Sequence, residues 1–168
     1  DVLGSRGLGD VYKRQVVVGL ALDDDGIPAT AAGRLAIAEK IIARAAEYGI
    51  EKRNIIIDPL ALTISTGPDN AAVDLEVIRK LAEQKIKTIM GVSNISFGLP
   101  SRDAVNSTFF TLAMEAGLSC AIINPQSKAM LDAYYAYRAL KGLDEGCTAY
   151  VKRFADSGNK VPAAAVSE

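Results

Sequence analysis

The chain has 168 residues, of which 49% are apolar, and its 19 basic and 20 acidic side chains are spread along the sequence. This apolar content is sufficient for the core of one domain. The near-neutral charge argues against nucleic acid or an anionic membrane surface as a partner. The apolar runs are shorter than the roughly 20 residues of a membrane span, and the start does not resemble a signal peptide. We therefore expect a cytoplasmic protein.

The two cysteines, Cys120 and Cys147, follow no disulfide pattern, and the chain contains no histidine. This combination argues against a zinc site, so no metal site is predicted. Cys120 lies in an apolar segment, which predicts a buried structural thiol.

Residues 1–15 contain three glycines and lack a helical or strand period. Their last six residues, DVYKRQ, resemble translated adapter sequence at the ends of some metagenomic reading frames. We expect this segment to be non-native and exclude it from the fold argument. A native but disordered start is the alternative.

From residue 16 an apolar strand followed by an amphipathic helix recurs four times. The expected strands are 16–22, 54–57, 88–92 and 119–123, and the expected helices are 30–48, 69–84, 104–116 and 127–140. Thr30 is the expected cap of the first helix, Ser101 or Asp103 that of the third, and Gly117 the stop of the third. Residues 142–150 could begin a further helix, and the rest of the tail resembles a linker.

Buried strands that alternate with helices predict an α/β fold with a parallel sheet. The strand starts are 31 to 38 residues apart, close to the repeat of a (β/α)8 barrel of about 250 residues. Four such units amount to half a barrel. A small open doubly wound sheet is the competing architecture.

Polar residues follow each expected strand, and parallel strands bring their carboxyl ends to one edge. These residues are 23–25, Asp58, Ser93, Asn94 and Asn124. Carboxylate and carboxamide groups suit a flat, donor-rich heterocycle. Each residue also has a simpler interpretation: Asp58 could end a strand before Pro59, and the two asparagines could form turns. Arg102 could be a surface charge or a partner of Asp103. The chain lacks a Gly-rich phosphate loop.

Several segments carry a family resemblance. Residues 91–110 read GVSNISFGLPSRDAVNSTFF, and DGIP (25–28), NIIIDPL (54–60) and GLSCAIINP (117–125) accompany them. In this order and spacing they resemble the pterin-binding barrel shared by cobalamin-dependent methionine synthase and the methyltetrahydrofolate:corrinoid methyltransferases. The resemblance covers residues 16–140.

The resemblance implies the second half, strands five to eight, of a dihydropteroate synthase-like (β/α)8 TIM barrel. It implies transfer of the N5 methyl group of 5-methyltetrahydrofolate to a cob(I)alamin or corrinoid acceptor. Asp58 would hydrogen-bond the pterin ring, Asn94 would act near N5 as the catalytic residue, and Arg102 would contact the folate beyond the ring. The corrinoid would be held by another module or protein. Residues 141–168 would lead toward such a cobalamin-binding module, and a homodimer is possible.

Strands one to four of such a barrel are not in this sequence, so we expect a fragment of a larger enzyme that is inactive in isolation. A half barrel leaves two apolar strand edges unpaired, which predicts self-association or poor solubility. Two alternatives stay open. One is a dihydropteroate synthase-type pterin enzyme, although residues 93–96 read Ser-Asn-Ile-Ser where that family has a basic group. The other is a non-catalytic half-barrel.

Overall fold

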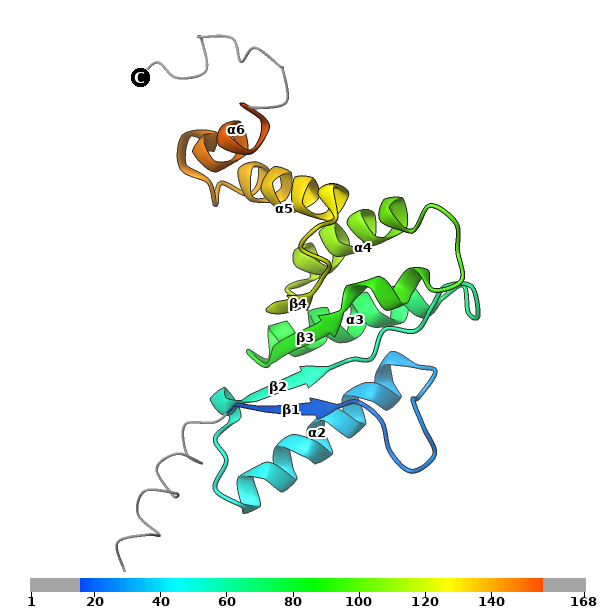
Figure 1. Ribbon diagram of the computed structural model, residues 1–168. Coiled ribbons are helices and arrows are strands. Elements are labelled where there is room, and N and C mark those ends of the chain that lie inside the picture. The colour runs from blue at the N-terminus through cyan, green and yellow to red at the C-terminus, as the bar shows by residue number, and fades with distance from the viewer. Residues whose placement is uncertain (1–15, 156–168) are drawn as a thin grey trace, which may run out of the picture.

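A computed structural model describes residues 16–155 as strands that alternate with helices (Figure 1). The predictions for residues 1–15 and for the end of the tail lie outside the described residues. Within residues 16–155, none of the helices has the length and hydropathy that crossing a bilayer requires.

The predicted four strand–helix units are confirmed; the first and fourth strands are shorter than expected, and the second and third have the expected length with a shift of one residue. The strands are β1 (Val17–Leu20), β2 (Ile55–Asp58), β3 (Lys87–Gly91) and β4 (Cys120–Ile122). The helices are α2 (Ala31–Glu47), α3 (Asn70–Glu83), α4 (Arg102–Ala116), α5 (Lys128–Leu140) and α6 (Thr148–Ala155). Three short 3₁₀ helices join them: η1 (Lys52–Asn54), η2 (Val92–Ser96) and η3 (Glu145–Cys147).

The helix ends follow the local sequence with one exception. Thr30 caps α2, because its side chain accepts a hydrogen bond from the Gly33 amide at 3.2 Å. Gly117 ends α4 with a φ of 103°, a conformation in which a glycine has no steric cost. The start of α4 differs from the prediction: the helix begins at Arg102, and Ser101 precedes it with a φ of 50° and makes no side-chain cap.

The four strands form one parallel sheet in the order β1-β2-β3-β4. Leu20 lies opposite Asp58 in the first pair of strands, and Gly91 lies opposite Ile122 in the last. A doubly wound sheet would reverse its strand order at a switch point, and the described sheet has no such reversal. The order is that of consecutive units of a β/α barrel.

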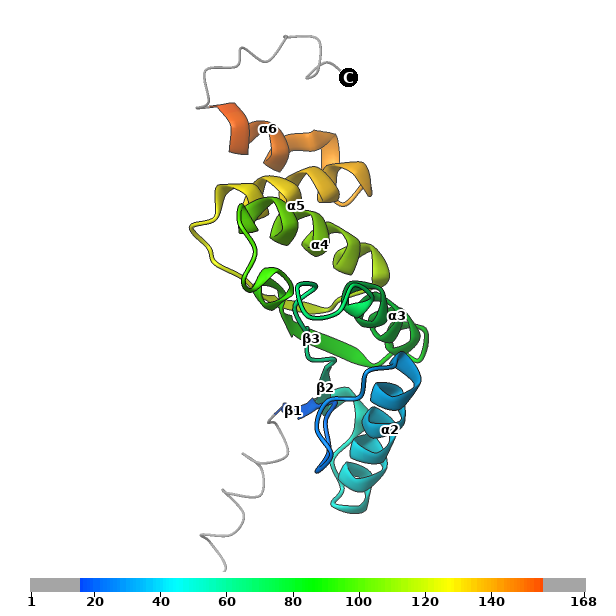
Figure 2. The ribbon, with the colours of Figure 1, turned by 90° about the vertical axis from the view of Figure 1, so that its right-hand side faces the viewer.

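Helices α2 to α5 lie along one face of this sheet, which Figure 2 shows from the side. Two apolar clusters fill the space between the layers. One lies under α2 and α3 and includes Ile57 and Leu81, and the other lies under α4 and α5 and includes Met90 and Phe110. Since these side chains are almost fully buried, the strands are firmly attached to their helices.

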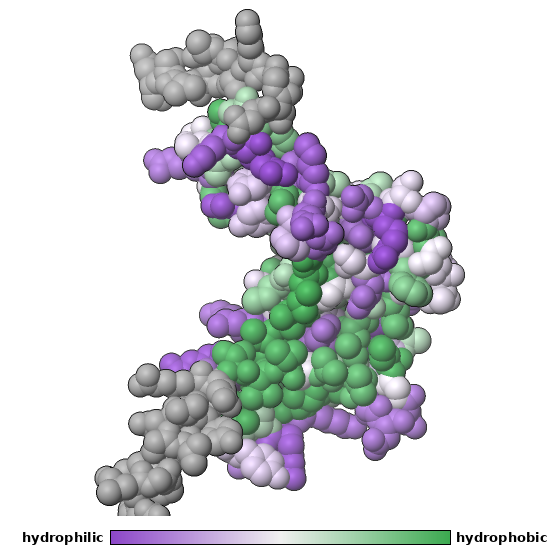
Figure 3. Space-filling view, viewed as in Figure 1, coloured by the Kyte–Doolittle hydropathy of each residue, from purple (hydrophilic) through white to green (hydrophobic). Residues whose placement is uncertain are grey.

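The opposite face of the sheet is apolar and uncovered by the described residues (Figure 3). Gly19 faces α2, since a Cβ there would lie 2.8 Å from Ile41. Strand alternation therefore directs Val18 and Leu20 away from the helices, and they are 48% and 45% exposed. On the other edge, Ile122 is 61% exposed.

The prediction of a buried Cys120 is wrong, because this residue is exposed. In the described sheet β4 is an edge strand, paired with β3 on one side only. An apolar strand sequence predicts burial only where neighbouring elements cover the strand, and this one lacks such a neighbour among residues 16–155.

The first residues after α5, predicted as the start of a linker or as a further helix, form η3 and α6. Both carboxylate oxygens of Asp144 accept backbone hydrogen bonds at the start of α6, from Ala149 at 2.9 Å and Tyr150 at 2.8 Å. Arg153 of α6 pairs with Asp132 of α5 at 3.1 Å. Helix α6 is therefore attached to α5, and the continuation toward another module stays a prediction.

Candidate functional site

The residues predicted to bind a ligand follow β2, β3 and β4 at the carboxyl edge of the sheet. The structure brings only some of them together. Ser93, Arg102 and Asn124 line a shared pocket of about 290 Å³ between the ends of β3 and β4 and the starts of α4 and α5. The pocket wall is completed by Asp103, Asn106, Ser127 and Met130. Asp58 and Asn94 lie outside it.

Asp58 is the last residue of β2, and its side chain is half-buried. By register with Leu20 it belongs to the sheet face that the helices leave open. Its Oδ1 accepts a hydrogen bond from the Leu60 amide at 2.8 Å. Burial raises the pKa of the Asp58 carboxyl above its ordinary value, and the Leu60 hydrogen bond acts against this rise. Since Oδ1 is engaged, Oδ2 is the acceptor that remains for a ligand.

Asn94 lies in η2, directly after β3, and its side chain is exposed. The neighbouring Val92 and Ile95 are buried and anchor this short helix to the core. Gly91 gives the carboxamide its space, because a Cβ at that position would lie 3.3 Å from Asn94 Nδ2. The carboxamide is thus presented on a firmly anchored turn and can both donate and accept a hydrogen bond.

Arg102 is bound to the η2 segment and not to Asp103. Its Nη2 donates to the Ser93 carbonyl oxygen at 2.6 Å, and its Nε donates to Ser96 Oγ at 2.9 Å. Ser96 Oγ in turn donates to Oδ1 of the buried Asn106 at 2.7 Å. Asp103 accepts a hydrogen bond from Ser127 Oγ at 3.0 Å. One structural role of Arg102 is therefore to hold the turn that carries Asn94.

Asn124 and residues 23–25 form turns. Oδ1 of Asn124 accepts a hydrogen bond from the Gln126 amide at 2.9 Å. Oδ1 of Asp23 likewise accepts from the Asp25 amide at 3.1 Å, in an exposed loop. Local side-chain hydrogen bonds of this kind are the usual role of Asn and Asp in turns.

Comparisons with known proteins identify the family of the chain. Residues 30–124 match the family described as "Pterin binding enzyme". The chain belongs to that family. It is 34% identical to the methylcorrinoid:tetrahydrofolate methyltransferase of Eubacterium limosum over 141 residues. These residues cover 82% of this chain and 52% of that protein. It is 38% identical to the methionine synthases of Mycobacterium tuberculosis and Mycobacterium leprae over 117 residues. These residues cover 64% of this chain and 10% of each relative.

The chain thus spans about half the length of the first of these relatives. The pterin-binding resemblance predicted from GVSNISFGLPSR is confirmed at the level of the family. The individual roles of Asp58, Asn94 and Arg102 stay predictions, which the geometry above makes specific enough to test.

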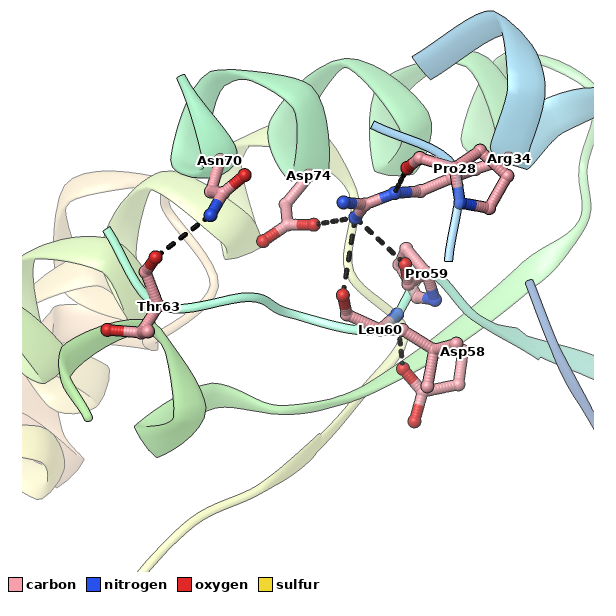
Figure 4. A network of polar contacts seen from close by, with 8 residues as sticks. All are labelled: Pro28, Arg34, Asp58, Pro59, Leu60, Thr63, Asn70 and Asp74. Atoms are coloured by element: carbon pink, nitrogen blue, oxygen red, sulfur yellow. Dashed lines mark hydrogen bonds and ion pairs between the residues drawn. The ribbon is translucent and has the colours of Figure 1, made fainter. Parts of the chain in front are cut away.

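Sequence reasoning missed a buried ion pair that lies close to Asp58. Arg34 of α2 and Asp74 of α3 have fully buried side chains, and Arg34 Nη1 lies 2.5 Å from Asp74 Oδ1 (Figure 4). The sequence held a signal for both. Each occupies the apolar stripe of its helix, Arg34 three residues after Ala31 and Asp74 three before Val77, where a charge is unexpected.

Proposed function

We propose that this chain supplies strands five to eight of a pterin-binding (β/α)8 barrel that transfers a methyl group between N5 of a folate and a corrinoid. The observation that carries the proposal is the arrangement of the carboxyl edge in a member of the pterin-binding family. Asp58 ends β2 and accepts a hydrogen bond from the Leu60 amide there. Asn94 lies in η2 directly after β3, and Arg102 at the start of α4 holds that turn through Ser93 and Ser96. The relatives that match the chain are named as methyltransferases and methionine synthases.

Asp58 would recognise the pterin ring. Its Oδ2 makes no hydrogen bond within residues 16–155, and a carboxylate accepts well from ring N–H and amino groups. The half-buried position would strengthen this hydrogen bond, since a lower local dielectric increases its electrostatic part.

Asn94 would act on the reacting nitrogen. A tertiary amine is a poor leaving group, so N5 must gain a proton as the methyl group departs. A carboxamide can turn to stabilise the protonated nitrogen without itself titrating, and this contribution falls largely in the transition state. The exposed Asn94 side chain beside Gly91 has the space for its carboxamide to rotate in this way.

The corrinoid would come from another module or protein and would supply the nucleophile that accepts the methyl group. The chain has no histidine and so offers a cobalt ion no imidazole ligand. Its own residues would orient the folate and exclude water. Residues 141–168 would lead toward the corrinoid-binding module.

The direction of transfer is a second question that one relative raises. The protein of Eubacterium limosum is named for transfer from a methylcorrinoid to tetrahydrofolate. The same side chains would serve either direction, because a reaction and its reverse share one transition state. We propose the folate-to-corrinoid direction and expect the reverse to use Asn94 equally.

Methyl transfer is the direct test. Strands one to four would be added to the chain, and the absorbance change of cob(I)alamin on methylation would be followed with methyltetrahydrofolate as donor. We expect Asn94→Ala to slow transfer strongly and Asp58→Ala chiefly to weaken folate binding, measured by calorimetry. Undiminished transfer in Asn94→Ala would contradict the proposed role. A protein that binds folate and never transfers the methyl group would favour a dihydropteroate synthase-type enzyme or a non-catalytic half-barrel.

A further inference from the structure

None of the proposed ligand contacts is made by the buried Arg34–Asp74 pair, and burying two charged groups costs free energy of desolvation. Both side chains are fully buried, and the ion pair is made through Arg34 Nη1 and Asp74 Oδ1 alone. Arg34 Nη2 and Asp74 Oδ2 have no partner among residues 16–155. Replacing a buried ion pair by apolar side chains is often neutral or stabilising. Stability alone therefore gives no good reason for this pair.

The other hydrogen bonds of Arg34 show what it holds. Its Nε donates to the Pro28 carbonyl oxygen at 2.9 Å, and its Nη1 donates to the carbonyl oxygens of Pro59 at 3.0 Å and Leu60 at 3.3 Å. Pro28 belongs to the loop after β1, and Pro59 and Leu60 directly follow Asp58 at the end of β2. One guanidinium thus joins the loops at the carboxyl ends of two adjacent strands (Figure 4).

Leu60 connects this guanidinium to the Asp58 carboxyl. Leu60 has a φ of 66°, in the left-handed region that a branched side chain rarely adopts. Such a conformation persists only where its surroundings impose it. Here Arg34 binds the carbonyl groups of Pro59 and Leu60, and the Leu60 amide is left pointing at Asp58 Oδ1, 2.8 Å away.

We propose that Arg34 and Asp74 are positioning residues, which hold the 59–60 turn so that Asp58 keeps Oδ1 on the Leu60 amide and presents Oδ2 to a ligand. Arg34 supplies the contacts to the turn. Asp74 holds the guanidinium in place by accepting a hydrogen bond from Arg34 Nη1. The inference rests on the proposed function only in its last step, that the ligand on Oδ2 is a pterin.

The test uses nuclear magnetic resonance on the 168-residue chain, with the hydrogen-exchange rate of the Leu60 amide as the readout. The Ile64 amide is an internal reference, because it lies in the same loop and donates to the Ile95 carbonyl oxygen at 3.0 Å. In Arg34→Met we expect Leu60 exchange to accelerate by about tenfold or more, because the variant loses roughly one charge-assisted hydrogen bond to the turn. Ile64 exchange should stay the same. Arg44→Met, which removes an exposed arginine from the same helix, is the matched control.

Arg34→Lys covers the case in which the methionine variant fails to fold. Lysine keeps the positive charge beside Asp74 and lacks the planar fork that reaches several carbonyl groups. We expect a folded protein in which Leu60 exchange is still accelerated relative to Ile64. Equal Leu60 exchange in wild type and Arg34→Lys, or parallel acceleration of both amides, would overturn the inference.

Calorimetry with methyltetrahydrofolate separates this inference from the proposed function. Weaker folate binding in the Arg34 variants, together with selective Leu60 acceleration, supports both. Selective Leu60 acceleration in the Arg34 variants, together with a wild-type protein that binds no folate, supports the positioning of Asp58 and counts against the pterin as its ligand. Folate binding that Arg34→Lys leaves unchanged counts against the positioning role.

Discussion

Arg102 Nη2 donates to the Ser93 carbonyl oxygen at 2.6 Å, so the first residue of α4 holds the residue that precedes Asn94. Its Nε reaches Ser96 at the other end of η2. A residue predicted from the family resemblance to contact folate is thus also part of the support of the turn that carries Asn94. A substitution there should affect two properties of the enzyme.

We expect Arg102→Met to weaken folate binding and also to lower the rate of methyl transfer at saturating folate. The rate should fall because the unsupported η2 segment lets Asn94 move, and small displacements of a catalytic group are costly. The measurement is kcat and KM in the completed barrel. Arg138→Met, an arginine of α5 that donates to the Leu143 carbonyl oxygen, is the control. A change in KM alone would restrict Arg102 to a ligand contact.

Gly91→Ala tests the space around Asn94. The added Cβ would lie 3.3 Å from Asn94 Nδ2, which is close enough to displace the carboxamide by a few tenths of an ångström. Gly91 has a φ of −77°, which alanine adopts without strain, so the fold should be retained. We expect slower methyl transfer with little change in folate affinity. A methyl-transfer rate equal to that of the wild type would contradict this prediction and show that a small displacement of the Asn94 carboxamide does not affect transfer.

The fold followed from the sequence to a large extent, because apolar strands and amphipathic helices alternate at a regular spacing. The prediction that failed concerns burial at the edge of the sheet. Cys120 has apolar neighbours in the sequence, as a buried strand residue does, but it lies on an edge strand and is exposed. Burial depends on what covers a strand, and local sequence does not contain this information.

At the site, sequence reasoning identified the residues that follow each strand and missed the residues that fix them. Asp58 and Asn94 were found because they sit at predictable places. Arg34 and Asp74 support the site through contacts between segments that are 25 and 40 residues apart in sequence. Ser96 and Asn106 support it through a contact between η2 and the helix that follows it, which the sequence pattern does not reveal. A charge in the apolar stripe of a helix was the one signal for Arg34 and Asp74.

The pKa of Asp58 predicts the pH dependence of folate binding. Burial raises the pKa of this carboxyl, and only its ionised form is a full acceptor for the ring donors. Affinity should therefore decrease on acidification at a higher pH than an ordinary aspartate would produce. Asp58→Asn should bind more weakly and lose this pH dependence, and Glu39→Gln, on the exposed side of α2, should keep it. Calorimetric titrations across the acidic range provide the measurement. A wild-type affinity that is constant over this range would contradict the role of Asp58.

Asp74 makes the stability of the fold depend on pH. Burial raises the pKa of its carboxyl from 3.8 to about 7, with Arg34 acting against the rise. Between these values the folded chain retains a proton that the unfolded chain releases, so the free energy of unfolding falls as pH rises, by at most about 1.4 kcal/mol per pH unit. We expect Asp74→Asn to remove this decrease and to gain stability relative to wild type from pH 4 to pH 7. Urea unfolding at several pH values measures it. Parallel curves for the two proteins would mean that Asp74 stays ionised beside Arg34.

The uncovered strand face should make the isolated chain self-associate. Val18, Leu20 and Ile122 are between 45% and 61% exposed on this face, and both edge strands have unpaired backbone groups among the described residues. Apolar surface and free edges of this kind promote association. We expect light scattering after gel filtration to give a mass above that of the monomer and Ile122→Lys to reduce it. Leu140→Lys changes an 85% exposed leucine at the end of α5 and should leave the mass unchanged. A wild-type chain that stays monomeric as its concentration rises would contradict this prediction. An equal reduction by both variants would show that general solubility, and not this face, controls the association.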